Sequence, residues 1–253
     1  MSAAKRPEAE IGVFGGSGLY SLLPEVTEVE LDTPYGPPAG ALHLGQVAGR
    51  SVAFLPRHGP GHELPPHRIN YRANLWAMHH LGVRRILAPC ASGSLRPDIR
   101  PGEFVVPDQL VDRTAGRADT FHDGPDVVHA SFADPFDEEM RAAAVAAGRA
   151  EGITVHDGGT VVVIQGPRFS TRAESQWYAA QGWHVINMTQ YPEAVLAREL
   201  GIAYASIALV TDYDAGAPGA PAVTQDEVFG FFAANLERVR ALLFRALAEL
   251  PAR

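Results

Sequence analysis

The sequence lacks most of the features that mark secreted, membrane-spanning or nucleic-acid-binding proteins. It has one cysteine, Cys90, in 253 residues, which excludes an internal disulfide and fits a reducing cytoplasm. It has no run of 18 apolar residues to span a membrane, and residues 1–10 lack the apolar stretch of a secretory signal. Its net charge of −8 argues against a nucleic-acid partner. We therefore expect a cytoplasmic protein whose partners include neither a membrane nor a nucleic acid.

Along the chain, short apolar segments alternate with segments that have helical periodicity. Apolar residues make up 46% of the chain, enough for a sizeable core, and no repeat or linker divides it. This alternation predicts one α/β domain over residues 11–253, with a sheet between helices, after a flexible N-terminus at 1–10. Strands are expected at 11–14, 26–31, 41–47, 51–56, 84–91, 104–111, 154–165 (with a hairpin or bulge at Gly158-Gly159), 184–189 and 202–210, and helices at 69–81, 136–150, 172–180, 192–200 and 225–250.

The first of these strands runs into Gly15-Gly16-Ser17-Gly18. Glycines allow a tight loop and a close ligand, and successive backbone N–H groups in such a loop form a concave anion site. The hydroxyl of Ser17 can donate to a phosphate oxygen. A plain strand-to-turn junction fits the same residues, because short glycine motifs are common by chance.

Further polar side chains stand where other predicted strands end. Arg57 and His58 directly follow the strand at 51–56, and the guanidinium of Arg57 matches the geometry of phosphate. A solvated surface turn is the alternative for this pair. Thr189 stands between a strand and a helix, where it can cap the helix or bind phosphate. His58 and His62 have the spacing of helical zinc ligands, but glycine and proline between them exclude a helix, so we expect no metal.

Two carboxylates follow the buried strand at 202–210. Asp212 and Asp214 lie two residues apart on an extended segment, so their side chains face the same way with Cα atoms about 7 Å apart. Repulsion and burial raise the pKa of one of them. A protonated carboxyl can donate to a ring nitrogen and an ionised one can accept from an amine, so together they can hold a 6-aminopurine edge. A solvated turn or a pair of magnesium ligands fits the same spacing.

Taken together, several motifs in fixed order give the chain a family likeness. The sequence resembles the methylthioadenosine phosphorylase and trimeric purine nucleoside phosphorylase family, which implies a three-layer αβα domain with a central mixed, twisted sheet. The matching stretches are Gly15-Gly16-Ser17-Gly18-Leu19, Arg57-His58-Gly59, Asn70-Tyr71-Arg72-Ala73-Asn74, Gly93-Ser94-Leu95, Gly166-Pro167-Arg168-Phe169-Ser170, Asn187-Met188-Thr189 with Pro192-Glu193, and Thr211-Asp212-Tyr213-Asp214.

The resemblance implies phosphorolysis, in which inorganic phosphate attacks the anomeric carbon of a purine nucleoside without a metal or an organic cofactor. The implied reaction converts 5′-methylthioadenosine and phosphate to adenine and 5-methylthioribose 1-phosphate, in purine salvage. The alternative is a broader purine nucleoside phosphorylase that acts on adenosine, inosine, guanosine or another 5′-substituted nucleoside. The resemblance also implies a homotrimer, for which the irregular segment 113–135 is the candidate subunit contact.

The resemblance assigns site residues in three groups. The phosphate-binding group is Ser17, Arg57, His58, the backbone of Ala91, and Thr189. The catalytic pair that grips N7 and the 6-amino group of the purine is Asp212 and Asp214. The remaining substrate contacts are Phe169 against the purine ring, Ser170 beside the base, Met188 along the ribose, and His129 from the neighbouring subunit with Gln225 and Phe229 at the 5′ end.

Four positions bear on specificity. Ser170 and Asp212 stand where 6-oxopurine enzymes of the family tend to carry Glu and Asn, and a carboxylate repels a 6-oxo group, so adenine nucleosides are expected. Gln225 departs from an apolar 5′ pocket, since its amide can bind a 5′-hydroxyl. Cys90 replaces a hydroxyl residue often seen beside the phosphate.

Three rival functions remain at this point. A hydrolytic nucleosidase uses water and does not need the anion site at Ser17, Arg57 and His58. A dinucleotide-dependent oxidoreductase needs G-x-G-x-x-G, whose last glycine is missing after Gly16-Ser17-Gly18. A non-catalytic purine-binding protein does not need both a phosphate set and a base set, and a turnover assay separates it from an enzyme.

Overall fold

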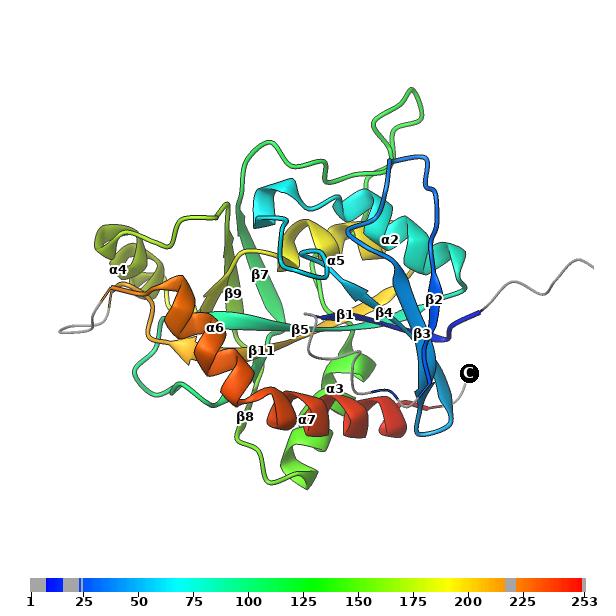
Figure 1. Cartoon of the computed structure of the whole chain (residues 1–253). Coiled ribbons are helices and arrows are strands. Elements are labelled where there is room, and N and C mark those ends of the chain that lie inside the picture. The colour runs from blue at the N-terminus through cyan, green and yellow to red at the C-terminus, as the bar shows by residue number, and fades with distance from the viewer. Residues whose placement is uncertain (1–7, 16–22, 24, 217–221, 252–253) are drawn as a thin grey trace, which may run out of the picture.

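The computed structural model describes residues 8–15, 23, 25–216 and 222–251, and within them one eleven-stranded sheet carries helices on both faces (Figure 1). The strands are β1 (Ile11–Gly15), β2 (Thr27–Val29), β3 (Leu42–Val47), β4 (Arg50–Pro56), β5 (Arg85–Ser94), β6 (Phe104–Val106), β7 (Gln109–Arg113), β8 (Val155–Asp157), β9 (Thr160–Ile164), β10 (Val185–Asn187) and β11 (Ala203–Asp212). The helices are η1 (Pro66–Arg68), α2 (Tyr71–His80), α3 (Glu138–Ala150), α4 (Arg172–Ala180), α5 (Gln190–Glu199), α6 (Gln225–Ala234) and α7 (Leu236–Glu249).

The sheet is mixed and branches at β5. Its main path runs β2-β3-β4-β1-β5-β10-β9-β7, while β11 pairs with β5 and β6, and β6 also pairs with β8. The pairs of β5 with β1 and β11 are parallel, and its pair with β10 is antiparallel. The predicted mixed α/β sheet is therefore confirmed.

Alternating side chains along the central strands build the two cores. On β11, Tyr204 and Ala208 belong to the core that includes residues of α2 and α5, whereas Ala205 and Ile207 belong to the core that includes residues of α3 and α7. A strand whose two faces are both covered consists of a continuous run of apolar residues, as β11 does. Figure 1 shows α2 and α5 above the sheet and α3 and α7 below it, so the three-layer prediction is confirmed.

Strands β5, β10 and β11 come together at one residue. Gly93 of β5 pairs with Ile186 of β10 on one side and with Asp212 of β11 on the other. The register of β11 shifts between Val210 and Asp212, an irregularity of the kind that re-aims a side chain. Strand β5 thus continues to Ser94 instead of ending at Ala91 as predicted.

Three further predictions need correction. The segment 104–111 forms β6 and β7, which pair with different strands, so the chain changes partners near Pro107. The glycine pair 158–159, with φ of 93° and 115°, turns a corner between β8 and β9 and makes neither a hairpin nor a bulge, because β8 pairs with β6 while β9 pairs with β7 and β10. The expected helix 225–250 breaks at Asn235, whose backbone leaves the helical region and whose side-chain amide donates to the carbonyl of Phe231.

The N-terminal segment 1–10 is described only from residue 8. Residues 1–7 of this segment, which was expected to be flexible, lie outside the described residues. Ala9 is buried, and its N–H donates to the carbonyl of Leu81 over 2.9 Å. The packed part of the chain therefore begins before Ile11.

Candidate active site

A cavity of about 670 Å³ lies where β4, β5, β10 and β11 end. This volume lies in the range of small-molecule sites, and the carboxyl ends of strands are where open α/β sheets bind ligands. Helix α6 contributes one wall and the segment after β4 another. The predicted site residues that line it are Arg57, His58, Ala91, Phe169, Met188, Thr189, Asp212, Asp214, Gln225 and Phe229.

Three predicted site residues do not line this cavity. Ser17 lies outside the described residues. Ser170 is buried near its edge, and its hydroxyl has no hydrogen-bond partner among the described residues. His129 is exposed and belongs to no wall of this cavity. Its assignment to a neighbouring subunit stays a prediction.

Arg57 reaches the cavity as half of a buried ion pair. Its Nε and Nη2 donate to the two carboxylate oxygens of Glu193 over 2.7 and 3.0 Å, and its Nη1 donates to the carbonyl of Pro89 over 2.8 Å. Tyr204 also donates to Glu193, over 2.8 Å. Burial lowers the pKa of Arg57, but the Glu193 carboxylate outweighs it, so the pKa lies above the ordinary value. One N–H on each terminal nitrogen remains for a ligand.

His58 is held in one tautomer beside this arginine. Its Nδ1 lies 2.8 Å from the carbonyl oxygen of Leu64, which can only accept, so Nδ1 carries the hydrogen. Burial lowers the pKa of His58 to about 3, and the nearby Arg57 charge acts in the same direction. The ring is therefore neutral near pH 7, and Nε2 is an acceptor. It stacks on His62 at 4.2 Å, and His62 in turn meets Phe229 edge-on at 4.7 Å.

Thr189 completes the polar end of the cavity. It is the N-cap of α5, yet its side chain makes no capping hydrogen bond within the described chain, so its hydroxyl is available to a ligand. The backbone of Tyr191, with φ of −115° and ψ of 130°, interrupts α5 directly afterwards, so the contribution of Thr189 is its hydroxyl and not a helix dipole. Cys90 lies in the same wall, and its sulfur accepts from the side-chain amides of Asn187 and Gln190 over 3.3 and 3.4 Å. This end can therefore hold an anion.

The two aspartates form a linked pair in another wall. The backbone N–H of Asp214 donates to Oδ1 of Asp212 over 2.9 Å, and the Thr211 hydroxyl donates to Oδ2 of Asp212 over 2.7 Å. Asp214 is buried, and its Oδ2 has no partner among the described residues. Burial raises the pKa of both carboxyls. The hydroxyls of Ser175 and Ser170 lie near Asp214 and act against this rise of its pKa, and its Oδ2, which makes no hydrogen bond within the described chain, is open to a ligand.

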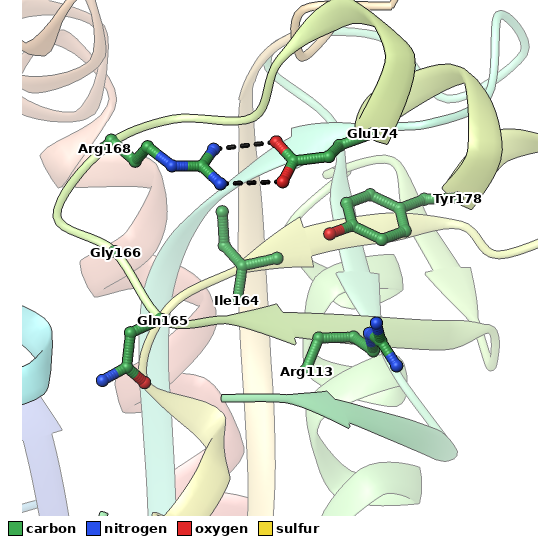
Figure 2. Close-up of a pocket in the computed structure, with 7 residues that line it drawn as sticks. All are labelled: Arg113, Ile164, Gln165, Gly166, Arg168, Glu174 and Tyr178. Atoms are coloured by element: carbon green, nitrogen blue, oxygen red, sulfur yellow. Dashed lines mark hydrogen bonds and ion pairs between the residues drawn. The ribbon is translucent and has the colours of Figure 1, made fainter. Parts of the chain in front are cut away.

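The loop that carries Phe169 and Ser170 is fixed by an ion pair, shown in Figure 2. Arg168 donates to both carboxylate oxygens of Glu174 over 2.7 Å, and also to the carbonyl of Phe169 over 3.0 Å. Arg168 and a backbone hydrogen bond from Thr171 lower the pKa of Glu174 to about 2. These groups border a side cavity of about 100 Å³, which shares Ile164 with the large cavity.

Some polar residues of the site have no role predicted from the sequence. Glu193 stands within a family motif, although a buried arginine needs a carboxylate partner and thus signals one. The spacing of His62 suggests only a metal ligand, whereas its ring packs between His58 and Phe229, and Glu63 beside it also lines the cavity. In the described part of the chain, no three His, Cys, Asp or Glu side chains gather to hold a metal ion. Nor does that part contain a helix long and apolar enough to cross a bilayer.

Donors for an anion and a buried carboxyl pair share one cavity of small-molecule size, an arrangement typical of α/β enzymes that transfer groups. The family model of the Phosphorylase superfamily matches residues 10–248. The chain therefore belongs to the phosphorylase superfamily.

Relatives of known name support the same family. A purine nucleoside phosphorylase of Streptomyces coelicolor is 58% identical over 98% of this chain and 92% of its own length. An S-methyl-5′-thioadenosine phosphorylase of Mycolicibacterium smegmatis is 55% identical over 94% of this chain and 90% of its own. The methylthioadenosine phosphorylase of Schistosoma mansoni in complex with adenine superposes with a TM-score of 0.90 at 40% identity, covering 95% of this chain and 91% of that one.

Proposed function

We propose that this enzyme cleaves 5′-methylthioadenosine with inorganic phosphate to give adenine and 5-methylthioribose 1-phosphate. The observation that carries the proposal is the buried, unpartnered carboxyl oxygen of Asp214 in the same cavity as Arg57 and Thr189. A purine base, which donates and accepts hydrogen bonds, satisfies the Asp214 oxygen, and an anion satisfies Arg57 and Thr189. The names of the bacterial relatives and of the adenine complex support the same substrate class.

In the proposed reaction, phosphate bound by Arg57 and Thr189 attacks the anomeric carbon. Bond breaking puts positive charge on the sugar and negative charge on the purine, and the adjacent phosphate stabilises the sugar. Asp214, whose pKa is raised by burial, donates a proton toward N7. Asp212 accepts hydrogen bonds from the Thr211 hydroxyl and the Asp214 N–H, which offset part of the rise that burial causes in its pKa, and its ionised form would accept the 6-amino N–H. His58 accepts a hydrogen bond at Nε2 from a protonated phosphate oxygen.

The 5′ end of the nucleoside would lie against α6. Val228, Phe229 and Phe232 of α6, with Leu236 at the start of α7, form an apolar wall there, which suits a methylthio group, and Gln225 adds one amide. The second candidate is a broader purine nucleoside phosphorylase, in which Gln225 binds a 5′-hydroxyl. The name of the Streptomyces coelicolor relative favours it.

The proposal extends to assembly, compartment and cofactors. Val127 and Val128, beside His129, are 71% and 50% exposed, and adjacent exposed apolar residues are typical of a contact surface. This supports a contact between copies of the chain, and the homotrimer in which His129 serves a neighbouring cavity is the assembly that the family resemblance implies. We place the enzyme in the cytoplasm and in purine salvage, and we expect it to use phosphate as co-substrate without a metal or an organic cofactor.

The test is base release from 5′-methylthioadenosine, adenosine and inosine, each with and without phosphate. The proposal expects adenine from methylthioadenosine, and only with phosphate. Release without phosphate would show a hydrolase. Preference for adenosine that is lost in Gln225→Leu would favour the second candidate, and Glu237→Gln, an exposed change on α7, serves as the control.

A further inference from the structure

Arg117 lies behind the cavity wall and joins the ends of two strands. Its Nη1 donates to the carbonyl of Met188 over 3.0 Å and also to that of Tyr191. Its Nη2 donates to the carbonyls of Gln165 and Ile164 over 2.9 and 3.4 Å. Its Nε donates to the side-chain oxygen of Gln165 over 3.2 Å. One guanidinium therefore fixes the backbone where β9 and β10 end.

Through Tyr71, the same guanidinium is also linked to the segment at Pro66, which forms another wall of the cavity. It lies 5.4 Å from the centre of the Tyr71 ring, and Nη1 donates to the phenolic oxygen over 3.2 Å. The Tyr71 hydroxyl in turn donates to the carbonyl of Pro66 over 2.8 Å. Pro66 and Met188 line the large cavity, whereas Arg117 does not. Its influence on the site must therefore be indirect.

The chain after β9, at Gly166, borders the side cavity and packs closely against Met188 and Pro66 of the large cavity, so small shifts matter. A Cβ placed on Gly166 would lie 2.6 Å from Sδ of Met188 and 3.2 Å from Cγ of Pro66. Gly166 also has a φ of 62°, which favours glycine. Loss of the common anchor behind these walls would let them move independently, and displacements of about 1 Å can cost on the order of 100-fold in rate.

We propose that Arg117 is a positioning residue that holds Met188, Gly166 and Pro66 in register, so that the ribose is presented to phosphate in the attacking geometry. The assignment of the ribose to this wall rests on the proposed function. The six acceptors named above are four carbonyls, an amide oxygen and a phenol. The guanidinium offers five N–H donors on three nitrogens to reach them, whereas the ammonium of lysine offers three donors from one point.

The experiment compares Arg117→Ala, Arg117→Lys and Arg141→Ala. Arg141 is a matched control, because it also bonds a backbone carbonyl, that of Pro107 over 2.9 Å, and a side chain, Asp157, but lines no part of the cavity. Steady-state KM for nucleoside and for phosphate, kcat, and the thermal unfolding midpoint are measured for each. Dilute guanidinium chloride, far below denaturing concentrations, is then added as a chemical rescue.

We expect Arg117→Ala to lower kcat/KM for the nucleoside by roughly 10- to 100-fold, with less change in the KM for phosphate. Arg141→Ala should lower the unfolding midpoint and leave both KM values unchanged. Guanidinium should restore part of the activity of Arg117→Ala only. Where Arg117→Ala fails to fold, Arg117→Lys carries the test, and its activity should stay below that of the wild type.

The proposal is overturned if Arg117→Ala loses stability but keeps the nucleoside kcat/KM, or if Arg117→Lys matches the wild type. A wild-type protein that binds the nucleoside but does not cleave it would defeat the proposed function alone. In that case the ratio of nucleoside Kd values, measured by calorimetry for wild type and variant, still decides the role of Arg117: a raised Kd supports it and an equal Kd overturns it.

Discussion

Arg57 and Glu193 lie 136 residues apart in sequence and form a two-bond ion pair inside the protein. Their side chains are only 5% and 1% exposed. The pair does two things at once, since Glu193 fixes the plane of the guanidinium and balances most of its charge. A phosphate ion bound there, as proposed, would meet an oriented donor edge instead of a mobile cation, in a protein whose overall charge is unfavourable to anions.

Arg57→Ala should therefore damage both stability and phosphate use. Removing one partner of a buried pair leaves an uncompensated charge on Glu193, which typically costs about 3–5 kcal/mol. The KM for phosphate should rise, because the oriented donors are gone. Urea unfolding and steady-state kinetics measure the two effects. An unchanged KM for phosphate would remove Arg57 from the site.

The double variant Arg57→Met with Glu193→Leu separates these effects. Replacing both charges by apolar groups of similar size removes the buried charge, so most of the lost stability should return. The KM for phosphate should stay raised, because the donors of Arg57 are still missing. Recovery of phosphate KM in the double variant would show that Arg57 acts only in folding.

Gly93→Ala is expected to impair base binding with little loss of folding. A Cβ there would lie 3.0 Å from Oδ1 of Asp212, 3.1 Å from Cγ2 of Ile186 and 3.2 Å from Cβ of Asp214, so the aspartate pair must shift by a few tenths of an ångström. The KM for an adenine nucleoside should rise severalfold, while the phosphate KM stays. Gly124→Ala is the control, because nothing lies within 4 Å of a Cβ at that position. Equal kinetics for the two variants would contradict the assigned base site.

The layer structure and the location of the site could be predicted, because both follow from local patterns. Apolar runs bounded by glycine give strands covered on both faces. Polar residues directly after parallel runs must then gather at one edge of the sheet, which is where Arg57 and Asp212 lie, whereas Thr189 follows the antiparallel β10 and needs the fold to be placed. The alternation of residues along β11 already specifies which side chains enter each core.

Features that depend on distant partners could not be predicted. The segment 104–111 has one continuous pattern, and only its pairing with β11, β8 and β9 shows two strands. The apolar stripe of the last helix continues through Asn235, so the break there has no periodic signal. The contact of Arg117 with two strand ends likewise requires the fold, since no local motif links it to Met188.

Asp214→Asn tests the general-acid role. The amide cannot transfer a carboxyl proton to N7, so kcat with adenine nucleosides should fall by about 10² to 10⁴. In the wild type, the protonated carboxyl is the active form, so kcat should decrease as pH rises through the raised pKa of Asp214, and the variant should lose this dependence. Above that pKa the wild type keeps a buried carboxylate, so the variant should be at least as stable. Equal kcat values for the wild type and Asp214→Asn would contradict the general-acid role of Asp214.

His58 predicts how stability depends on pH. Its pKa is about 3 in the folded protein, because of burial, and about 6.5 in the unfolded chain. Between these values the unfolded state binds a proton that the folded state does not, so this contribution to stability is complete above pH 6.5 and is lost as pH falls toward 3. The slope from this group approaches 1.4 kcal/mol per pH unit.

His58→Asn isolates this term, because its amide can still donate to the carbonyl of Leu64. Asp212 and Asp214, with raised pKa values, give stability a slope of the opposite sign, but they are present in both proteins. The difference between the two unfolding free energies, measured in urea from pH 7.5 to 4.5, should therefore shrink as pH falls. Parallel curves for wild type and variant would show that burial does not lower the pKa of His58.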